Sequence, residues 1–159
     1  IVEDQRFAAV RPDVVSYVSS GLTDSLSVAG PITAELQVSM TGSDADFIVK
    51  LIDVLPANEP NFKNAPRGFQ MAGYQRLVRA EVIRGTFRNS LEKPEPFEPG
   101  KIHTVRLELN DVAHTFKKGH KIMVQIQSSW FPLFDRNPQT FMTIPEADEK
   151  DFIKSNIRI

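Results

Sequence analysis

KGHKIMVQIQSSWFPLFDRNPQTF, residues 118–141, combines a strand pattern and an aromatic loop in one stretch. In its first half three branched apolar residues, Ile122, Val124 and Ile126, alternate with more polar positions. Alternation with a period of two is typical of a half-buried β-strand, so we expect these three side chains to face the core. The opposite face is then largely polar, with Lys121, Met123, Gln125 and Gln127.

The second half of the stretch is a loop that is unusually rich in aromatic residues. Trp130, Phe131 and Phe134 surround Pro132, and Phe141 follows a few residues later. Loops normally lie on the surface of a protein and carry polar residues. We therefore expect this loop to be buried against another surface.

Length and composition limit the class of protein. The chain has 159 residues, which suits a single domain over residues 1–159 with a sizeable core. A net charge of -1 and the lack of a basic stripe argue against a nucleic-acid partner. No apolar run approaches the roughly 20 residues of a membrane helix, so we expect no membrane partner. The chain has no cysteine and shows no leader peptide, so its compartment, exported or cytoplasmic, stays open.

Other segments also read as strands. Residues 32–40 alternate without interruption and predict a half-buried strand. Residues 47–55 are apolar at both parities, which is typical of a strand covered on both sides in the middle of a sheet. Further strands are expected at residues 14–18, 26–29, 77–87, 104–109 and 152–159. The remaining expectations are an extended lead-in at 1–13, a turn at Gly30-Pro31, an irregular excursion at 56–73 and at most one helical turn at 110–118.

This pattern predicts an all-β fold. About eight short strands, turn signals roughly every ten residues and almost no helical periodicity indicate an antiparallel β-sandwich of two sheets. Loops of very unequal length favour a jelly roll or Greek key over a simple meander.

The sequence offers no catalytic site of its own. A serine hydrolase of the common kind carries G-x-S-x-G on a strand-to-helix turn, and no such pentapeptide occurs. Nothing in the spacing of His103, His114 and His120 selects a catalytic partner for any of them. We expect three surface or turn histidines and no catalytic residue.

A metal site is also weakly supported. His114 and His120 are separated by a spacing that matches no helical or hairpin pair of ligands. Asp44 and Asp46 form a D-x-D that could hold calcium, but without further acidic neighbours a turn before a strand fits them better. We expect no metal and no cofactor.

The aromatic loop allows two functions. Its rings could form a sugar-stacking platform, which would make the chain a free-standing carbohydrate-binding module. Such platforms favour Trp and Tyr, however, and this loop is mainly Phe, so packing against another domain is the stronger interpretation. Charged side chains beside so much apolar surface need partners, and we expect Asp135 and Arg136 to pair with each other.

Four stretches together resemble a known family. They are EDQRFAAVRPDVVSYVSSGLT (Glu3–Thr23), VAGPITAELQVS with DADFIVKLIDVLP (residues 28–56), RGTFRNSLEKPEPFEPG (Arg84–Gly100) and HTFKKGHKIMVQIQSSWFPLFDRNPQTF (His114–Phe141). The chain resembles the C-terminal non-catalytic domain of the X-Pro dipeptidyl-peptidase, cocaine esterase and α-amino-acid ester hydrolase family, which includes the glutaryl acylases. The first and last stretches look closest to the ester hydrolase and glutaryl acylase branch.

The resemblance implies an accessory role. In that family the domain is a jelly roll, and the Ser-His-Asp triad lies on an upstream α/β-hydrolase domain. The resemblance also implies that the jelly roll is truncated at both ends, which would leave sheet edges open to self-association into a homo-oligomer. We expect the chain to pack on the catalytic domain of a serine hydrolase of esters, amides or X-Pro peptides and to help shape its pocket. The predicted interdomain residues are Trp130, Phe131, Phe134, Asp135, Arg136 and Asn137.

Overall fold

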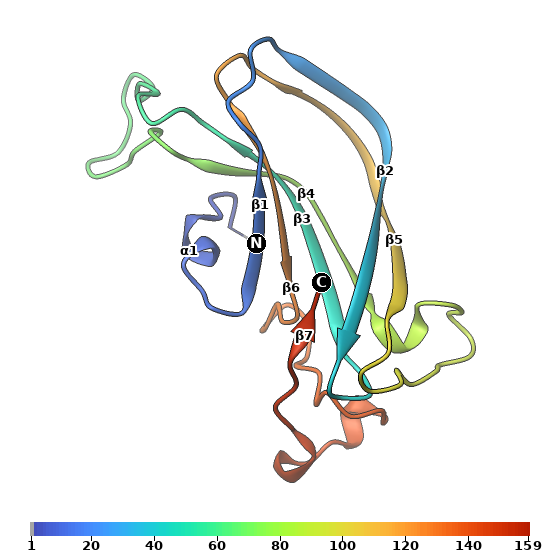
Figure 1. The fold of residues 1–159 in the computed structure, drawn as a ribbon. Helices are drawn as coiled ribbons and strands as arrows, with labels where there is room; N and C mark the ends of the chain where they lie inside the picture. Colours follow the sequence, from blue (N-terminus) through green and yellow to red (C-terminus); the bar gives the residue numbers. More distant parts are fainter. Residues whose placement is uncertain (1) are drawn as a thin grey trace. The chain divides into compact units, whose positions relative to one another are not determined.

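The chain folds into two antiparallel β-sheets with very little helix, as a computed structural model shows for residues 2–159 (Figure 1). Ile1, the first residue of the predicted lead-in, lies outside the described residues. The elements are α1 (Arg6–Ala9), β1 (Val14–Val18), β2 (Leu26–Met40), β3 (Asp46–Val54), β4 (Gln75–Arg84), η1 (Gly85–Phe87), β5 (His103–Phe116), β6 (Lys121–Gln127), η2 (Ile144–Glu146), η3 (Glu149–Asp151) and β7 (Ile157–Arg158), where η marks a 3-10 helix.

The sheets have four and three strands. Their orders are β1-β6-β3-β4 and β5-β2-β7, so the central strands are β6, β3 and β2. β7 pairs with the end of β2, with Ser39 opposite Arg158 and Met40 opposite Ile157. The predicted all-β sandwich is therefore confirmed, and so is the central place of the doubly apolar strand, β3. No helix among residues 2–159 has the length and apolar character needed to cross a membrane.

Contacts divide the chain into two compact units, each assembled from three segments. The first unit comprises Ile1–Ile32, Val49–Ala80 and Asn110–Ile126, and the second comprises Thr33–Ile48, Glu81–Leu109 and Gln127–Ile159. Each unit has buried apolar side chains of its own. Those of the first include Val49, Ile52, Val112, Phe116 and Met123, and those of the second include Val38, Phe47, Phe97, Val105 and Leu109.

The lead-in and the excursion of the first unit are more ordered than the sequence suggested. Residues 6–9 form one helical turn instead of an extended segment. The excursion at residues 56–73 has no regular strand or helix, as predicted, and extends as a long loop between β3 and β4 (Figure 1). Its side chains pack on one another, since the rings of Phe69 and Phe62 meet edge-on with 5.2 Å between their centroids.

Two strands are longer than predicted. β2 runs through Gly30-Pro31 without a break, and Gly30 takes a positive φ of 102° that residues with a Cβ rarely adopt. Pro31 lacks a backbone N–H, and the strand tolerates it there because β7 pairs with β2 only near the other end. β5 continues to Phe116, so the segment for which the sequence allowed at most one helical turn, 110–118, is mostly strand. Its second half alternates like its first, with Val112 and Phe116 buried.

The buried face of β6 differs from the prediction. Met123, Gln125 and Gln127, assigned to the polar face, are buried, whereas Ile122 and Val124 are only half-buried. β6 lies between β1 and β3, and near its end residues of both parities are buried, namely Gln125, Ile126 and Gln127. Gln127 Nε2 donates to the backbone carbonyl of Ser129 at 2.7 Å.

Candidate functional site: an aromatic loop and its polar anchor

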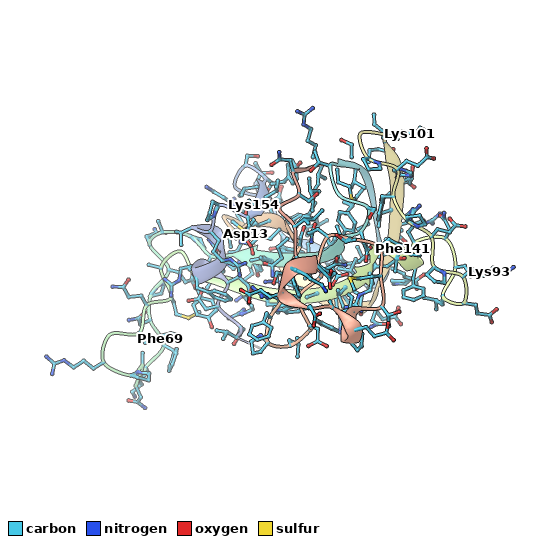
Figure 2. All side chains as sticks on the ribbon, turned by 90° about the horizontal axis from the view of Figure 1, so that it is seen from below. Asp13, Phe69, Lys93, Lys101, Phe141 and Lys154 are labelled. Carbon is cyan, nitrogen blue, oxygen red and sulfur yellow. The ribbon has the colours of Figure 1, made fainter. Side chains whose placement is uncertain are left out.

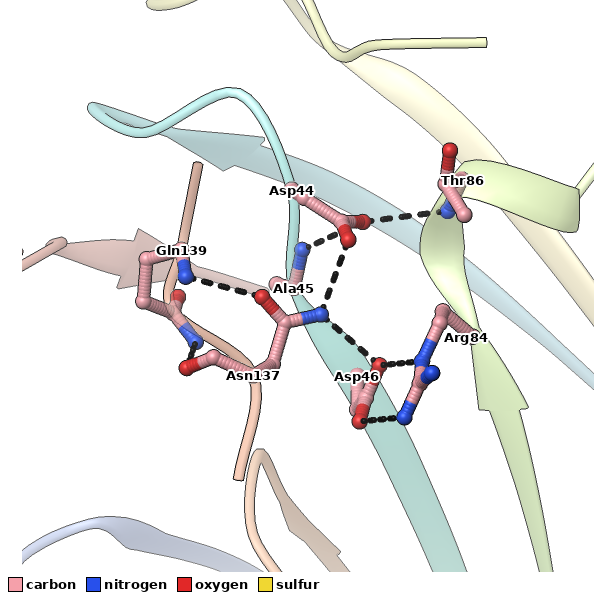
Figure 3. Close-up of polar contacts among 7 residues, drawn as sticks. All are labelled: Asp44, Ala45, Asp46, Arg84, Thr86, Asn137 and Gln139. Atoms are coloured by element: carbon pink, nitrogen blue, oxygen red, sulfur yellow. Dashed lines mark hydrogen bonds and ion pairs between the residues drawn. The ribbon is translucent and has the colours of Figure 1, made fainter. Parts of the chain in front are cut away.

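The aromatic loop, residues 130–137, ends in an asparagine that is buried and fully engaged. Asn137 Nδ2 donates to Asp44 Oδ2 and to Asp46 Oδ1, both at 2.9 Å, and its Oδ1 accepts the backbone N–H of Gln139 at 2.8 Å (Figure 3). One amide thereby bridges two carboxylates that come just before and at the start of β3. We call this group of Asp44, Asp46 and Asn137 the anchor.

The two carboxylates of the anchor differ in their other partners. Asp44 Oδ1 accepts the backbone N–H groups of Ala45 at 2.9 Å and Thr86 at 3.1 Å, whereas Asp46 pairs with the Arg84 guanidinium at 3.2 and 3.5 Å (Figure 3). Burial raises the pKa of the Asp44 carboxyl because it disfavours the charged form. Both aspartates are almost completely buried, so every donor in this group matters to stability.

Close backbone contacts hold the chain around the anchor. Ser43 N and Asp44 N both donate to the carbonyl of Gln139, at 3.1 and 3.4 Å. A Cβ added at Gly42 would lie 2.4 Å from that same carbonyl oxygen, and one added at Gly85 would lie 2.5 Å from the ring of Phe97. The turn before β3 and the end of the aromatic loop are thus fitted to each other without room for larger side chains.

The aromatic part of the loop points away from the interior of its unit. Phe131 is 64% exposed, Leu133 50% and Phe134 38%, while Trp130 is half-buried and makes ring contact with Phe134 at 6.1 Å. Backbone N–H groups of Leu133 and Phe134 donate to the carbonyl of Trp130, so the loop has a defined turn. Nothing among residues 2–159 buries Phe131 or Leu133.

The predicted interdomain residues fall into two groups. Trp130, Phe131, Phe134, Asp135 and Arg136 lie in the exposed part of the loop or at its margin, whereas Asn137 is only 6% exposed and faces the anchor. The expected Asp135–Arg136 pair is wrong. The Arg136 guanidinium lies over the ring of Phe152 instead, 5.1 Å from its centroid.

The histidines of the first unit form a cluster that sequence analysis missed. Asp53 is 1% exposed and accepts from His114 Nε2 at 2.9 Å and from His120 Nδ1 at 2.8 Å. His114 lies in β5 and packs edge-on against Phe116, with 4.7 Å between ring centroids, so the prediction of surface or turn histidines is wrong for it. His120 does close a turn, because its N–H donates to the Lys117 carbonyl, but it is buried. Asp53 on β3 is 61 residues from His114 on β5 and 67 residues from His120, which comes just before β6, so the cluster forms only in the folded chain.

A buried lysine is a second feature that the sequence did not reveal. Lys50 on β3 is 0% exposed, its Nζ donates to Gln5 Oε1 at 2.8 Å, and it lies 5.9 Å from the centre of the Phe7 ring. Burial first, and then repulsion from Arg11, lowers the pKa of Lys50 to about 8. Keeping this ammonium charged at pH 7 therefore costs about 3 kcal/mol.

The lysine predicts a pH dependence of stability. Between pH 8 and the ordinary lysine pKa of 10.5, the unfolded chain binds a proton that the folded chain has lost, so stability rises with pH. Measured by urea unfolding from pH 7 to 10.5, the wild type should gain about 3 kcal/mol relative to Lys50→Met. The exposed Lys63→Met is the control and should keep a constant difference from the wild type. A constant difference for Lys50→Met would contradict the assignment.

Metal chemistry finds no support in the described part of the chain. No group of three or more His, Asp or Glu side chains among residues 2–159 is arranged to hold a metal ion. Asp44 and Asp46, the D-x-D considered for calcium, accept hydrogen bonds from Asn137, Arg84 and backbone N–H groups. The donors that surround these carboxylates already satisfy them.

Comparison with known proteins shows a family for nearly the whole chain. A family model described as the X-Pro dipeptidyl-peptidase C-terminal non-catalytic domain matches residues 3–154. Cocaine esterase from Rhodococcus sp. (strain MB1 Bresler) is 35% identical over 137 residues, which make up 86% of this chain and 21% of the esterase.

Solved structures agree with this assignment. An aminopeptidase from the marine sediment archaeon Thaumarchaeota archaeon is 43% identical with a TM-score of 0.90, over 98% of this chain and 25% of that one. An α-amino acid ester hydrolase is 41% identical with a TM-score of 0.89, over the same shares. The chain spans about a quarter of the length of these relatives. It belongs to the family of X-Pro dipeptidyl-peptidase C-terminal non-catalytic domains.

Proposed function

We propose that residues 1–159 are one jelly-roll domain of a longer serine hydrolase and that they pack on its upstream α/β-hydrolase catalytic domain. The relatives support this reading because they are a cocaine esterase, an aminopeptidase and an ester hydrolase about four times as long as the matched region. The domain contributes surface and rigidity, and the upstream domain breaks the ester, amide or X-Pro bond.

One observation carries the proposal: an apolar loop that is exposed in this chain and yet rigidly held. A monomeric surface seldom exposes neighbouring large apolar side chains unless they contact a partner. Phe131, Leu133 and Phe134 do so, and the anchor fixes the base of their loop with charge-assisted hydrogen bonds. A preformed loop loses little entropy when it docks, which favours binding.

The docking surface extends beyond the loop itself. The backbone N–H of Ile153 donates to the carbonyl of Pro138 at 3.0 Å, and Phe152 lies under Arg136. Ile153 is 48% exposed and Phe152 36%. Apolar groups from two distant segments of the second unit therefore lie beside each other, and we assign both to the contact with the catalytic domain. From this contact the loop helps to shape the acyl pocket.

A reactive-serine probe tests whether the nucleophilic serine lies outside this domain. When this chain is treated with a fluorophosphonate and assayed with an activated ester, we expect neither labelling nor hydrolysis above background. The full-length hydrolase should be labelled at a serine of a G-x-S-x-G sequence upstream of this domain. A serine of residues 1–159 found as the labelled or acylated residue would overturn the proposal.

Self-association is a second function that one observation favours. β1 lies at an edge of its sheet, and Val15, Tyr17 and Val18 are between 42% and 52% exposed. An apolar edge strand can pair with a strand of another copy. Light scattering on this chain and on the full hydrolase should then show a dimer or a larger assembly, and the Val15→Lys variant should be monomeric. If both wild-type proteins are monomers, this role is excluded.

A further inference from the structure

The second unit contains a pocket that neither the anchor nor the docking loop uses. Its volume is about 300 Å³, and its walls come from the end of β4 with η1, from Pro94 and from residues 141–145. Phe87, Pro94, Phe141, Met142, Ile144 and Pro145 give it a mainly apolar lining. This volume is at the lower end of the range for small-molecule sites.

The walls of the pocket are held in place by the protein itself. Arg88 donates to the carbonyls of Gly85, Glu95 and Pro96 at 2.8 to 3.1 Å and stacks on Phe97, which fixes the loop that carries Pro94. In Figure 2 the neighbouring Lys93 projects outward from this loop. On the other side, Phe141 N donates to Ser43 Oγ at 2.9 Å. A ligand would enter a preformed site.

Arg84 is the charged residue of the lining, and its charge is already compensated. Its Nε and Nη2 are directed at Asp46, which leaves Nη1 as the donor group that the ion pair does not use (Figure 3). Asp46 pairs with this guanidinium and Asn137 joins Asp46 to Asp44, so a ligand with a full negative charge would come near two carboxylates and one guanidinium. A neutral hydrogen-bond acceptor meets no such repulsion and can still accept from Nη1.

We propose that this pocket binds an uncharged molecule that combines an apolar ring or chain with one carbonyl group, such as an amide or ester. The volume admits about ten non-hydrogen atoms, at about 30 Å³ for each water-sized group. The apolar part lies against Phe87, Phe141 and Ile144, and the carbonyl oxygen accepts from Arg84. The inference rests on this chain alone and does not depend on the proposed docking.

Phenylacetamide is a suitable probe because it has a ring, a carbonyl and about the right size. We expect it to shift the methyl NMR signals of Met142 and Ile144 with a Kd on the order of 1 mM, as befits so small a ligand. Phenylacetate, the anion of the same shape, should bind at least tenfold more weakly, and so should ethylbenzene, which lacks an acceptor.

A variant at the rim localises the binding. Thr143 lines the pocket and is exposed, so Thr143→Trp should fold, fill the mouth and weaken phenylacetamide binding at least tenfold. Thr23→Trp, equally exposed but in the first unit, should bind like the wild type.

Three results would overturn the proposal. The first is that the signals of Met142 and Ile144 do not shift at any phenylacetamide concentration up to its solubility. The second is that phenylacetate binds with the same affinity as phenylacetamide, and the third is that ethylbenzene does. The second would mark an anion site and the third a purely apolar cavity. Unchanged affinity in Thr143→Trp would place the binding elsewhere.

Discussion

Replacing Asn137 by aspartate is expected to lower the free energy of unfolding of this chain by about 3–5 kcal/mol. The substitution removes the Nδ2 group that donates to both Asp44 and Asp46 and puts a third carboxylate between them. Arg84 is then the single cation for three buried acids, and like charges at hydrogen-bond distance repel strongly in surroundings of low polarity. Urea unfolding at pH 7 measures the loss.

Two further variants show whether charge or the lost bond is responsible. Asn137→Ala removes the donor without adding charge and should cost less, about 2 kcal/mol. The loss in Asn137→Asp should shrink as the pH falls toward 4, because protonated carboxyls no longer repel, whereas the loss in Asn137→Ala should not. Asn58→Asp, at an exposed position, is the control and should stay within about 0.5 kcal/mol of the wild type. An Asn137→Asp variant as stable as this control would contradict the role of the anchor.

Replacing Asp53 by alanine should destabilise the chain to a similar extent, by about 3–5 kcal/mol. Asp53 is the acceptor for a ring nitrogen of both His114 and His120, and all three groups lie in the interior of the first unit or at its margin. Without the carboxylate, two donors lose their partner and a cavity remains beside them. Thermal or urea unfolding gives the magnitude.

The matched control for this substitution is Asp24→Ala. Asp24 is exposed in the turn before β2, and its loss should cost no more than about 0.5 kcal/mol. Asp53→Asn should lie between the two, since an amide offers one carbonyl oxygen and can serve one histidine but not both. If Asp53→Ala and Asp24→Ala proved equally mild, the histidine cluster would not contribute to stability.

The strands could be predicted wherever the apolar pattern is local. β3 is apolar at both parities because residues on both of its faces are buried, and residues 32–40 alternate because one face is buried. Alternation did not predict the part of β5 beyond residue 109, because the polar residues Asn110, Asp111 and His114 interrupt the apolar pattern there. The histidine is accommodated there by Asp53, a residue 61 positions away.

The face of β6 was misjudged for a related reason. Hydrophobicity alone assigns Ile122 and Val124 to the interior, yet Gln125 and Gln127 are the more buried residues. A buried amide is acceptable where a hydrogen bond compensates its desolvation, as between Gln127 Nε2 and the Ser129 carbonyl, and hydrophobicity takes no account of such a bond. The same holds for Lys50, which reads as a surface residue and is covered by Gln5 and Phe7.

The candidate site could be predicted in part. The aromatic content of residues 130–134 distinguishes the loop in the sequence, and its exposure agrees with a surface that needs a partner. The anchor could not be predicted, because Asp44 and Asp46 are more than 90 residues from Asn137 and each has an ordinary local role as a turn residue. The Arg84 pocket likewise depends on two segments that no local pattern connects.

The central claim is that the exposed apolar loop docks on a catalytic domain, and a paired stability measurement tests it most directly. Phe131→Ser combined with Leu133→Ser removes the two most exposed apolar side chains of the loop. Because both are exposed in this chain, its own free energy of unfolding should change by less than about 1 kcal/mol. In the full-length hydrolase the same pair should cost about 2 kcal/mol or more and reduce turnover, since the proposed docking buries these side chains there. Equal stability and unchanged turnover of the full-length double variant would contradict the account.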